Sequence, residues 1–149
     1  MDVLGRLNEK ITKLQGIEAE IEVAIQKVIQ ANERYIVSLN ADDQLYRLGI
    51  DNKGISIMSY MPYRVATLDF KRIKNQPTDR VTLKDTGDFH YSFRIEYNST
   101  GFKIVADDRK ATELLRKYGE DILGLTAENV NKISINYIAP EITKLLENI

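Results

Sequence analysis

Apolar residues recur at helical spacing through the first third of the chain. Steps of three and four join Leu4, Leu7, Ile11 and Leu14. The same spacing then continues through a second set of apolar residues: Ile17, Ile21, Ile25 and Val28. This period predicts a helical region over residues 1–48. Gly16 interrupts the rhythm, so we expect a bend or a division into two helices there.

The helical period disappears between residues 49 and 82. Asp51–Gly54 has the composition of a turn in which Gly54 takes a positive φ. The segment Tyr63–Lys74, bracketed by prolines, is compatible with either a short helix or an irregular excursion. We therefore describe residues 49–82 as an irregular segment.

Strict alternation marks a β-hairpin in the second half of the chain. Phe93, Ile95 and Tyr97 alternate with polar residues, which predicts a half-buried strand. Asn98–Gly101 reads as the turn. The returning strand again alternates, with Phe102, Ile104 and Ala106 on one face.

Helices are expected to follow the hairpin. Asp107 or Asp108 can cap a helix that Gly119 ends, and Thr126 can cap the last helix, which Pro140 should kink or divide. The predicted fold is therefore α+β: a long N-terminal helical region, a small antiparallel sheet built on a hairpin, and C-terminal helices. We expect one domain over residues 1–149, with segments 1–48, 49–82 and 83–149.

Composition restricts the possible functions. The 149 residues include no cysteine and one histidine, His90, which excludes disulfides, thiolate chemistry and a multi-histidine metal site within one subunit. No signal peptide or membrane-spanning run is visible, so we expect a protein without membrane contact. No phosphate loop, nucleophile elbow or metalloprotease motif is present. These observations predict a protein that is not an enzyme and holds no metal or cofactor.

Charge is unevenly distributed although the net charge is only −1. Residues 53–84 carry seven basic and two acidic residues, a net charge of +5, which leaves −6 on the flanks. Five of these cations are candidate contacts with an acidic neighbour or with DNA: Lys71, Arg72, Lys74, Arg80 and Lys84. The alternative interpretation is an ordinary solvated basic loop.

The tripeptide Asp85-Thr86-Gly87 also carries the catalytic carboxylate of aspartic proteases. In that class the aspartate enters from a buried apolar strand, whereas here Lys84 precedes it and a further charge, Asp88, follows the glycine. The structural interpretation is that Asp85 caps a short helix or closes a turn, and that Gly87 permits a close approach by a neighbour. His90 is expected to be a surface or hydrogen-bonded residue.

The order of motifs resembles that of a bacteriophage family. Leu83–Phe93 resembles the L-x-D-T-G-x-L-x-x-S-I signature of tail-completion and neck proteins, of the Mu-like virion morphogenesis type. Tyr60–Tyr63 lies upstream, as an aromatic-x-Pro element does in that family. Ile122–Asn129 resembles the Leu-Gly-Leu-Ser element that opens its last helix, although Glu120-Asp121 replaces an Arg-Pro pair.

The resemblance implies a structural role and no catalysis. Such proteins form homo-oligomeric rings at the head–tail junction and contact connector or tail proteins around the packaged DNA. The protein would then occur in the virion, and in the host cytoplasm during assembly. The motif residues with implied structural roles are Asp85, Thr86, Gly87, Phe89, Ser92, Leu123, Gly124 and Leu125. Two alternatives remain: a nucleic-acid-binding module using residues 64–84, and an aspartic-type protease acting through Asp85.

Overall fold

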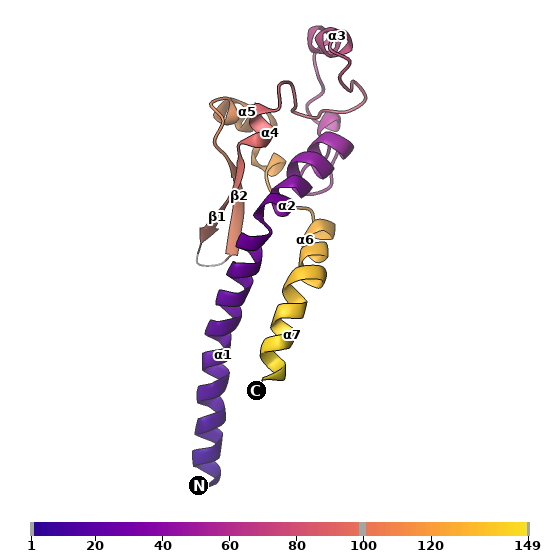
Figure 1. Cartoon of the computed structure of the whole chain (residues 1–149). Helices are drawn as coiled ribbons and strands as arrows, with labels where there is room; N and C mark the ends of the chain where they lie inside the picture. Colours follow the sequence, from indigo (N-terminus) through magenta and orange to yellow (C-terminus); the bar gives the residue numbers. More distant parts are fainter. Residues whose placement is uncertain (1, 99–100, 149) are drawn as a thin grey trace. The chain divides into compact units, whose positions relative to one another are not determined.

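The computed structural model describes residues 2–98 and 101–148 (Figure 1). Its contacts divide the chain into two compact units. Unit 1 comprises Met1–Asn32 and Lys132–Ile149, and unit 2 comprises Glu33–Asn131. Helices dominate and the described strands form one two-stranded antiparallel sheet, which confirms the predicted α+β class. The single domain over residues 1–149 stays a prediction.

Unit 1 is built on one long helix, α1 (Val3–Ala31), whose first turn is capped by the carboxylate of Asp2. The predicted division into two helices at Gly16 is wrong, because α1 runs through this residue without interruption. A glycine inside a helix costs only about 1 kcal/mol, which good helix-forming neighbours outweigh. The helix ends instead at Asn32, whose side-chain amide donates to the carbonyl of Val28.

The end of the chain packs along α1 within unit 1. A π-helical turn, η4 (Ser134–Ile138), leads into α7 (Ala139–Glu147), and both contact α1. Pro140 is expected to kink or divide the last helix. The helical residues run on from Ala127 to Glu147, and the hydrogen-bond pattern changes from π to α just before Pro140, which lies in the first turn of α7. A proline there needs no N–H donor, whereas further inside a helix it would break the hydrogen-bond ladder.

Unit 2 begins with α2 (Glu33–Ser38), which continues into a π-helix, η1 (Leu39–Leu48). The predicted turn follows, with Gly54 at φ +77°. A short 3-10 helix, η2 (Ile57–Ser59), comes next. The segment left open between helix and excursion then forms α3 (Val65–Ile73), so a helix is the correct alternative.

The predicted hairpin is present in unit 2. A four-residue helix, α4 (Asp88–Tyr91), precedes β1 (Phe93–Asn98), which pairs with β2 (Gly101–Ala106) so that Ile95 faces Ile104. The expected turn spans residues 99 and 100, which lie outside the described residues. After the hairpin come α5 (Ala111–Tyr118), η3 (Glu120–Ile122) and α6 (Ala127–Ile133).

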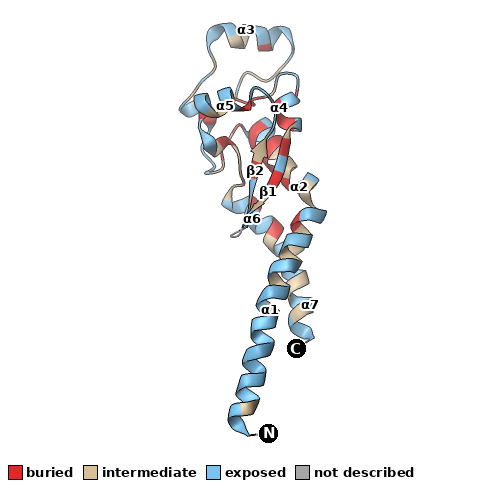
Figure 2. Cartoon of the chain, turned by 90° about the vertical axis from the view of Figure 1, so that its left-hand side faces the viewer, coloured by how far each residue is buried: buried red, intermediate tan, exposed pale blue. Residues whose placement is uncertain are grey.

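The core of unit 2 gathers apolar side chains from nearly all of its elements (Figure 2). The fully buried members are Ile36, Leu45, Ile57, Val81 and Ile122. Gly119 ends α5 and Thr126 caps α6 as predicted, since the Thr126 hydroxyl accepts from the amide of Asn129 at 3.2 Å. In unit 1, by contrast, the buried apolar residues among those described are only Ile29 and Ile133.

Candidate interaction surfaces

Unit 2 contains a cleft that brings together most of the predicted site residues. It lies between α3, the Leu83–Asp88 segment and α5, and it has a volume of about 480 Å³. Its apolar walls come from Tyr63, Phe70, Leu83, Phe89, Leu114 and Tyr118. Burial raises the pKa of Tyr118 to about 12, so its hydroxyl stays neutral and the wall remains uncharged at physiological pH.

Lys71 is the buried cation of this cleft, with only 6% of its surface exposed. Its Nζ donates to the carbonyl of Lys84 at 3.2 Å and to Oε1 of Gln76 at 3.4 Å. The same ammonium lies 4.8 Å from the ring centre of Tyr63. All these partners are neutral, and within the described part of the chain no carboxylate lies at ion-pair distance from Lys71. Sequence reasoning counted Lys71 as one surface charge among several.

Asp85 is engaged by two side chains at the rim of the cleft. Lys74 Nζ donates to Asp85 Oδ1 at 2.7 Å, and the amide of Gln76 donates to the same oxygen at 3.3 Å. The hydrogen bond from Lys74, followed by that from Gln76, holds the pKa of Asp85 below its usual range. The expectation that Asp85 caps the short helix is wrong, since Gly87 occupies the N-cap position of α4.

Gly87 fulfils its predicted role of allowing a close approach. Its φ is +96°, and an added Cβ would lie 2.8 Å from Cε2 of Tyr91. The hydroxyl of Thr86 accepts from the amide of Asp88 at 3.3 Å, and that of Ser92 donates to the carbonyl of Phe89 at 2.7 Å. These bonds are local, so the tripeptide forms a tight turn into α4.

His90 is buried, with 6% exposure, because α4 directs it inward before the strand alternation begins. Its Nε2 donates to the carbonyl of Thr82 at 2.9 Å, while Nδ1 has no partner. The hydrogen-bonded alternative is therefore correct and the surface alternative wrong. Burial lowers the pKa of His90 below 6.5, because a proton on Nδ1 would be both desolvated and unpaired.

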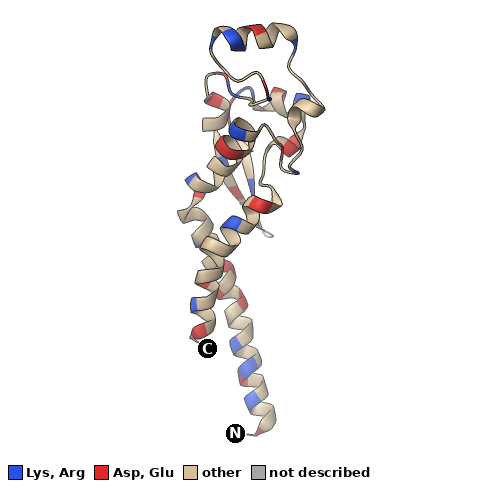
Figure 3. Cartoon of the chain, turned by 90° about the vertical axis from the view of Figure 1, so that its right-hand side faces the viewer, with Lys and Arg blue, Asp and Glu red and all other residues tan. Residues whose placement is uncertain are grey.

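Basic residues are spread over several elements of unit 2 (Figure 3), and not all of the remaining predicted cations line the cleft. Lys84 lines the cleft, and its Nζ lies 4.8 Å from the ring centre of Tyr46. Arg80 approaches the same ring and donates to the Tyr46 carbonyl at 2.6 Å. Arg72 pairs with Asp69 on the surface of α3 at 3.0 Å. Three of the five cations therefore line the cleft, and two lie outside it.

The residues Leu123, Gly124 and Leu125 are half-buried and lie outside the cleft, and Gly124 bonds to two buried side chains of η1. Asn40, fully buried on η1, accepts from the amide of Gly124 at 2.8 Å and donates to the carbonyl of Ile122 at 3.0 Å. Gln44, also fully buried, donates to the carbonyl of Gly124 at 2.8 Å and accepts from the amide of Thr126 at 2.9 Å. This clamp fixes the start of α6, and sequence reasoning missed it.

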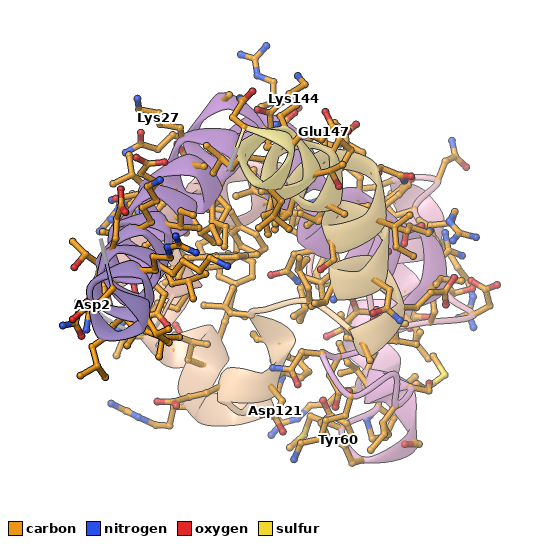
Figure 4. The ribbon with its side chains drawn as sticks, turned by 90° about the horizontal axis from the view of Figure 1, so that it is seen from below. Asp2, Lys27, Tyr60, Asp121, Lys144 and Glu147 are labelled. Atoms are coloured by element: carbon orange, nitrogen blue, oxygen red, sulfur yellow. The ribbon has the colours of Figure 1, made fainter. Side chains whose placement is uncertain are left out.

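The same end of unit 2 carries a smaller polar cluster. Tyr60 donates to Oδ2 of Asp51 at 3.2 Å, and Lys53 pairs with Asp121 at 3.0 Å. Figure 4 shows Tyr60 and Asp121 close together. Burial, and then the nearby charge of Asp51, raises the pKa of Tyr60 to about 12, so the hydroxyl stays protonated and serves as a donor. The cluster holds the Asp51–Gly54 turn in place.

In comparisons with known proteins, no family model matches this chain, and neither a curated protein nor a solved structure matches it. The resemblance to virion proteins therefore rests on the motif residues alone. No helix within the described residues combines the length and apolar character needed to cross a membrane. Within residues 2–98 and 101–148, no three His, Cys, Asp or Glu side chains gather closely enough to hold a metal ion.

A second surface lies on unit 1. The first half of α1 carries a row of apolar side chains that remain largely exposed: Val3, Leu4, Leu7, Ile11 and Leu14. Leu4 is 70% exposed, and Leu7 and Ile11 are each 50% exposed. Figure 2 shows this part of the helix in the exposed colour almost throughout. We call Leu4, Leu7, Ile11 and Leu14 the α1 row.

Proposed function

We propose that this chain is a structural component of a tailed-bacteriophage virion, a tail-completion or neck protein that joins head to tail as a homo-oligomeric ring. The observation that supports self-assembly is the exposed α1 row. Its four residues follow a heptad spacing, with alternating steps of three and four, which is the pattern that a partner helix covers. A row of this kind left bare in water favours association.

The charges of α1 favour a second copy as the partner. Its first half carries three basic residues, Arg6, Lys10 and Lys13, against Glu9. Its second half reverses the balance, with Glu18, Glu20 and Glu22 against Lys27. The basic half of one copy therefore complements the acidic half of another. Repeated from copy to copy, such a head-to-tail contact closes into a ring if its rotation allows.

The second half of α1 leaves space on the surface of unit 1 for such a partner. Val23 is 50% exposed, and a shallow surface hollow lies between Val23, Ala24 and Leu145. Figure 4 shows Lys27 and Lys144 at the outer edge of the two helices. The apolar side chains of the α1 row of another copy would fill this hollow. The basic residues beside that row would then approach the glutamates in the second half of α1.

The bacteriophage part of the proposal rests on the motif order. Asp85–Gly87 leads directly into α4 and the hairpin, as the resemblance implies. Leu123–Leu125 precedes the Thr126 cap of α6, again in the implied place. We propose connector and tail proteins as neighbours, a contact with packaged DNA, and a location in the virion after assembly in the host cytoplasm.

The two alternative functions have less support. Phosphate binding needs available cations, whereas Lys74, Arg72 and Arg80 are paired with aspartates of the same chain. An aspartic dyad needs two carboxylates that share a proton, whereas the Asp85 carboxylate is bound by an ammonium group. That the chain is not an enzyme stays a prediction.

Negative-stain imaging combined with a DNA titration separates these functions. Rings of uniform diameter, with no cleavage of peptide substrates, are the expected result. Binding to bare duplex DNA that weakens steeply with added salt, in the absence of rings, would instead favour the nucleic-acid module. Peptide cleavage that Asp85→Asn abolishes would favour the protease. Either of these two results would overturn the proposal.

A further inference from the structure

The cleft of unit 2 has the features of a binding site. Its volume of about 480 Å³ falls within the range of roughly 300–1,000 Å³ that is usual for ligand pockets. Most of the exposed area of its walls is apolar, and ten polar or charged residues also line it. Every residue that lines it belongs to unit 2, so the site is independent of any association through the α1 row.

The buried position of Lys71 indicates the charge of a group that this cleft would bind. A buried ammonium loses its hydration, and neutral acceptors replace only part of it. The three groups in contact with Lys71 Nζ are a carbonyl, an amide oxygen and an aromatic ring, and none carries a negative charge. The Asp85 carboxylate interacts with Lys71 only from beyond ion-pair distance, and it is bound by Lys74. A carboxylate that reached this ammonium would supply the opposite charge.

The other charged residues of the cleft are consistent with a ligand that carries a single negative charge. Four lysines and three aspartates line the cleft, which leaves one positive charge. Lys74 and Asp85 already neutralise each other at 2.7 Å. A phosphate dianion or a polyphosphate would bring more charge than this site balances, and it would leave the apolar walls uncovered. The chemistry fits one carboxylate attached to an apolar group.

The surface beside the cleft favours a polypeptide over a small molecule. Helix α3 leaves three large apolar side chains exposed: Val65 at 74%, Phe70 at 64% and Ile73 at 78%. Phe70 also lines the cleft, so the apolar surface continues from the cavity onto the helix. A peptide covers such a surface as well as the cavity, whereas a small acid covers the cavity alone.

We propose that this cleft binds a peptide segment of a partner protein, which inserts an apolar side chain between Tyr63, Phe89 and Tyr118 and places a neighbouring carboxylate against Lys71. The carboxylate is that of an aspartate or glutamate side chain or of a chain end. Lys71 is then the residue that determines specificity for an acidic segment. The apolar walls supply the contact area.

The test compares two peptides that differ only in charge, acetyl-Gly-Phe-Glu-Gly-amide and acetyl-Gly-Phe-Gln-Gly-amide, by NMR titration of the ¹⁵N-labelled protein. We expect both to shift the amides of Thr67, Leu83 and Gly87, with the glutamate peptide binding about tenfold more tightly. Equal binding of the two peptides, or shifts confined to other residues, would overturn the proposal. The comparison needs no variant, so it stands even if a substitution impairs folding.

Two variants then test whether Lys71 is the residue that distinguishes the glutamate peptide from the glutamine peptide. Lys71→Met keeps the length of the side chain and removes the buried charge, so we expect it to fold and to bind both peptides equally. Arg72→Met, the matched control, removes an exposed and paired cation of the same helix that does not line the cleft, and it should retain the tenfold preference. Loss of the preference in Arg72→Met but not in Lys71→Met would refute the role of Lys71. Shifts of the same amides by a ten-nucleotide single-stranded DNA, and not by either peptide, would favour a nucleic-acid site instead.

Discussion

Replacing the centre of the α1 row should weaken self-association without unfolding the protein. The double variant Leu7→Gln/Ile11→Gln places two amides where the row is expected to meet its partner. Both native side chains are 50% exposed in the single chain. Covering the remaining half of a leucine or isoleucine contributes about 1 kcal/mol, taken from roughly 2 kcal/mol for full burial.

The expected weakening follows from this figure. In the proposed head-to-tail contact, the α1 row of one copy meets the second half of α1 of the next copy, so the variant changes two side chains in each contact. Each contact then loses about 2 kcal/mol, or roughly thirtyfold in dissociation constant. Sedimentation velocity across a hundredfold range of concentration measures this change. The far-ultraviolet circular dichroism and the thermal midpoint should stay close to those of the native protein, because the substituted positions are half-exposed in the single chain.

A matched control places the same amides elsewhere on the helix. Thr12→Gln/Gly16→Gln alters two exposed, neutral residues away from the row, and it should associate as the native protein does. If both double variants weaken association equally, the row is not the contact. Undiminished association of Leu7→Gln/Ile11→Gln would refute the reasoning directly.

Three further predictions concern unit 2. Gln44→Leu should lower the free energy of unfolding by about 3 kcal/mol, measured by urea denaturation, because it leaves buried backbone partners unpaired; a loss below about 1 kcal/mol would contradict the clamp. Gly87→Ala should destabilise by about 1–3 kcal/mol through its positive φ and its clash with Tyr91, and adding Tyr91→Ala should recover only part of this loss; full recovery would show that φ is not strained. The unfolded state binds a proton near pH 6.5 more readily than buried His90 does, so stability should fall as pH drops through that value and towards the lower folded pKa. His90→Gln should remove this component of the pH slope in thermal melts, and an unchanged slope would contradict the assignment.

The sequence correctly predicted the elements whose formation depends on residues that are close to one another in the chain. The alternation around Ile95 and the cap at Thr126 each involve groups within a few residues, and the structure confirms both. Gly16 shows the limit of this reasoning. The prediction considered this one glycine by itself, whereas the apolar helical period continues on both sides of it.

The contacts that the sequence did not predict are hydrogen bonds between residues far apart in the chain. Asn40 and Gln44 bond to residues more than 75 positions away, and no local pattern identifies such partners. One signal was present: the two side chains lie four residues apart, on the line that Ile36 begins, so they are polar positions on an otherwise apolar face. The partners of Lys71 and Asp85 are likewise set by how α3 packs, which periodicity does not reveal.

The mass of the native protein in solution, measured by light scattering across concentration, tests the central claim of self-association most directly. We predict that the mass rises from the 17.1 kDa of a single chain to a discrete multiple as concentration increases. A folded protein that keeps a mass of 17.1 kDa up to the highest attainable concentration would contradict association through α1.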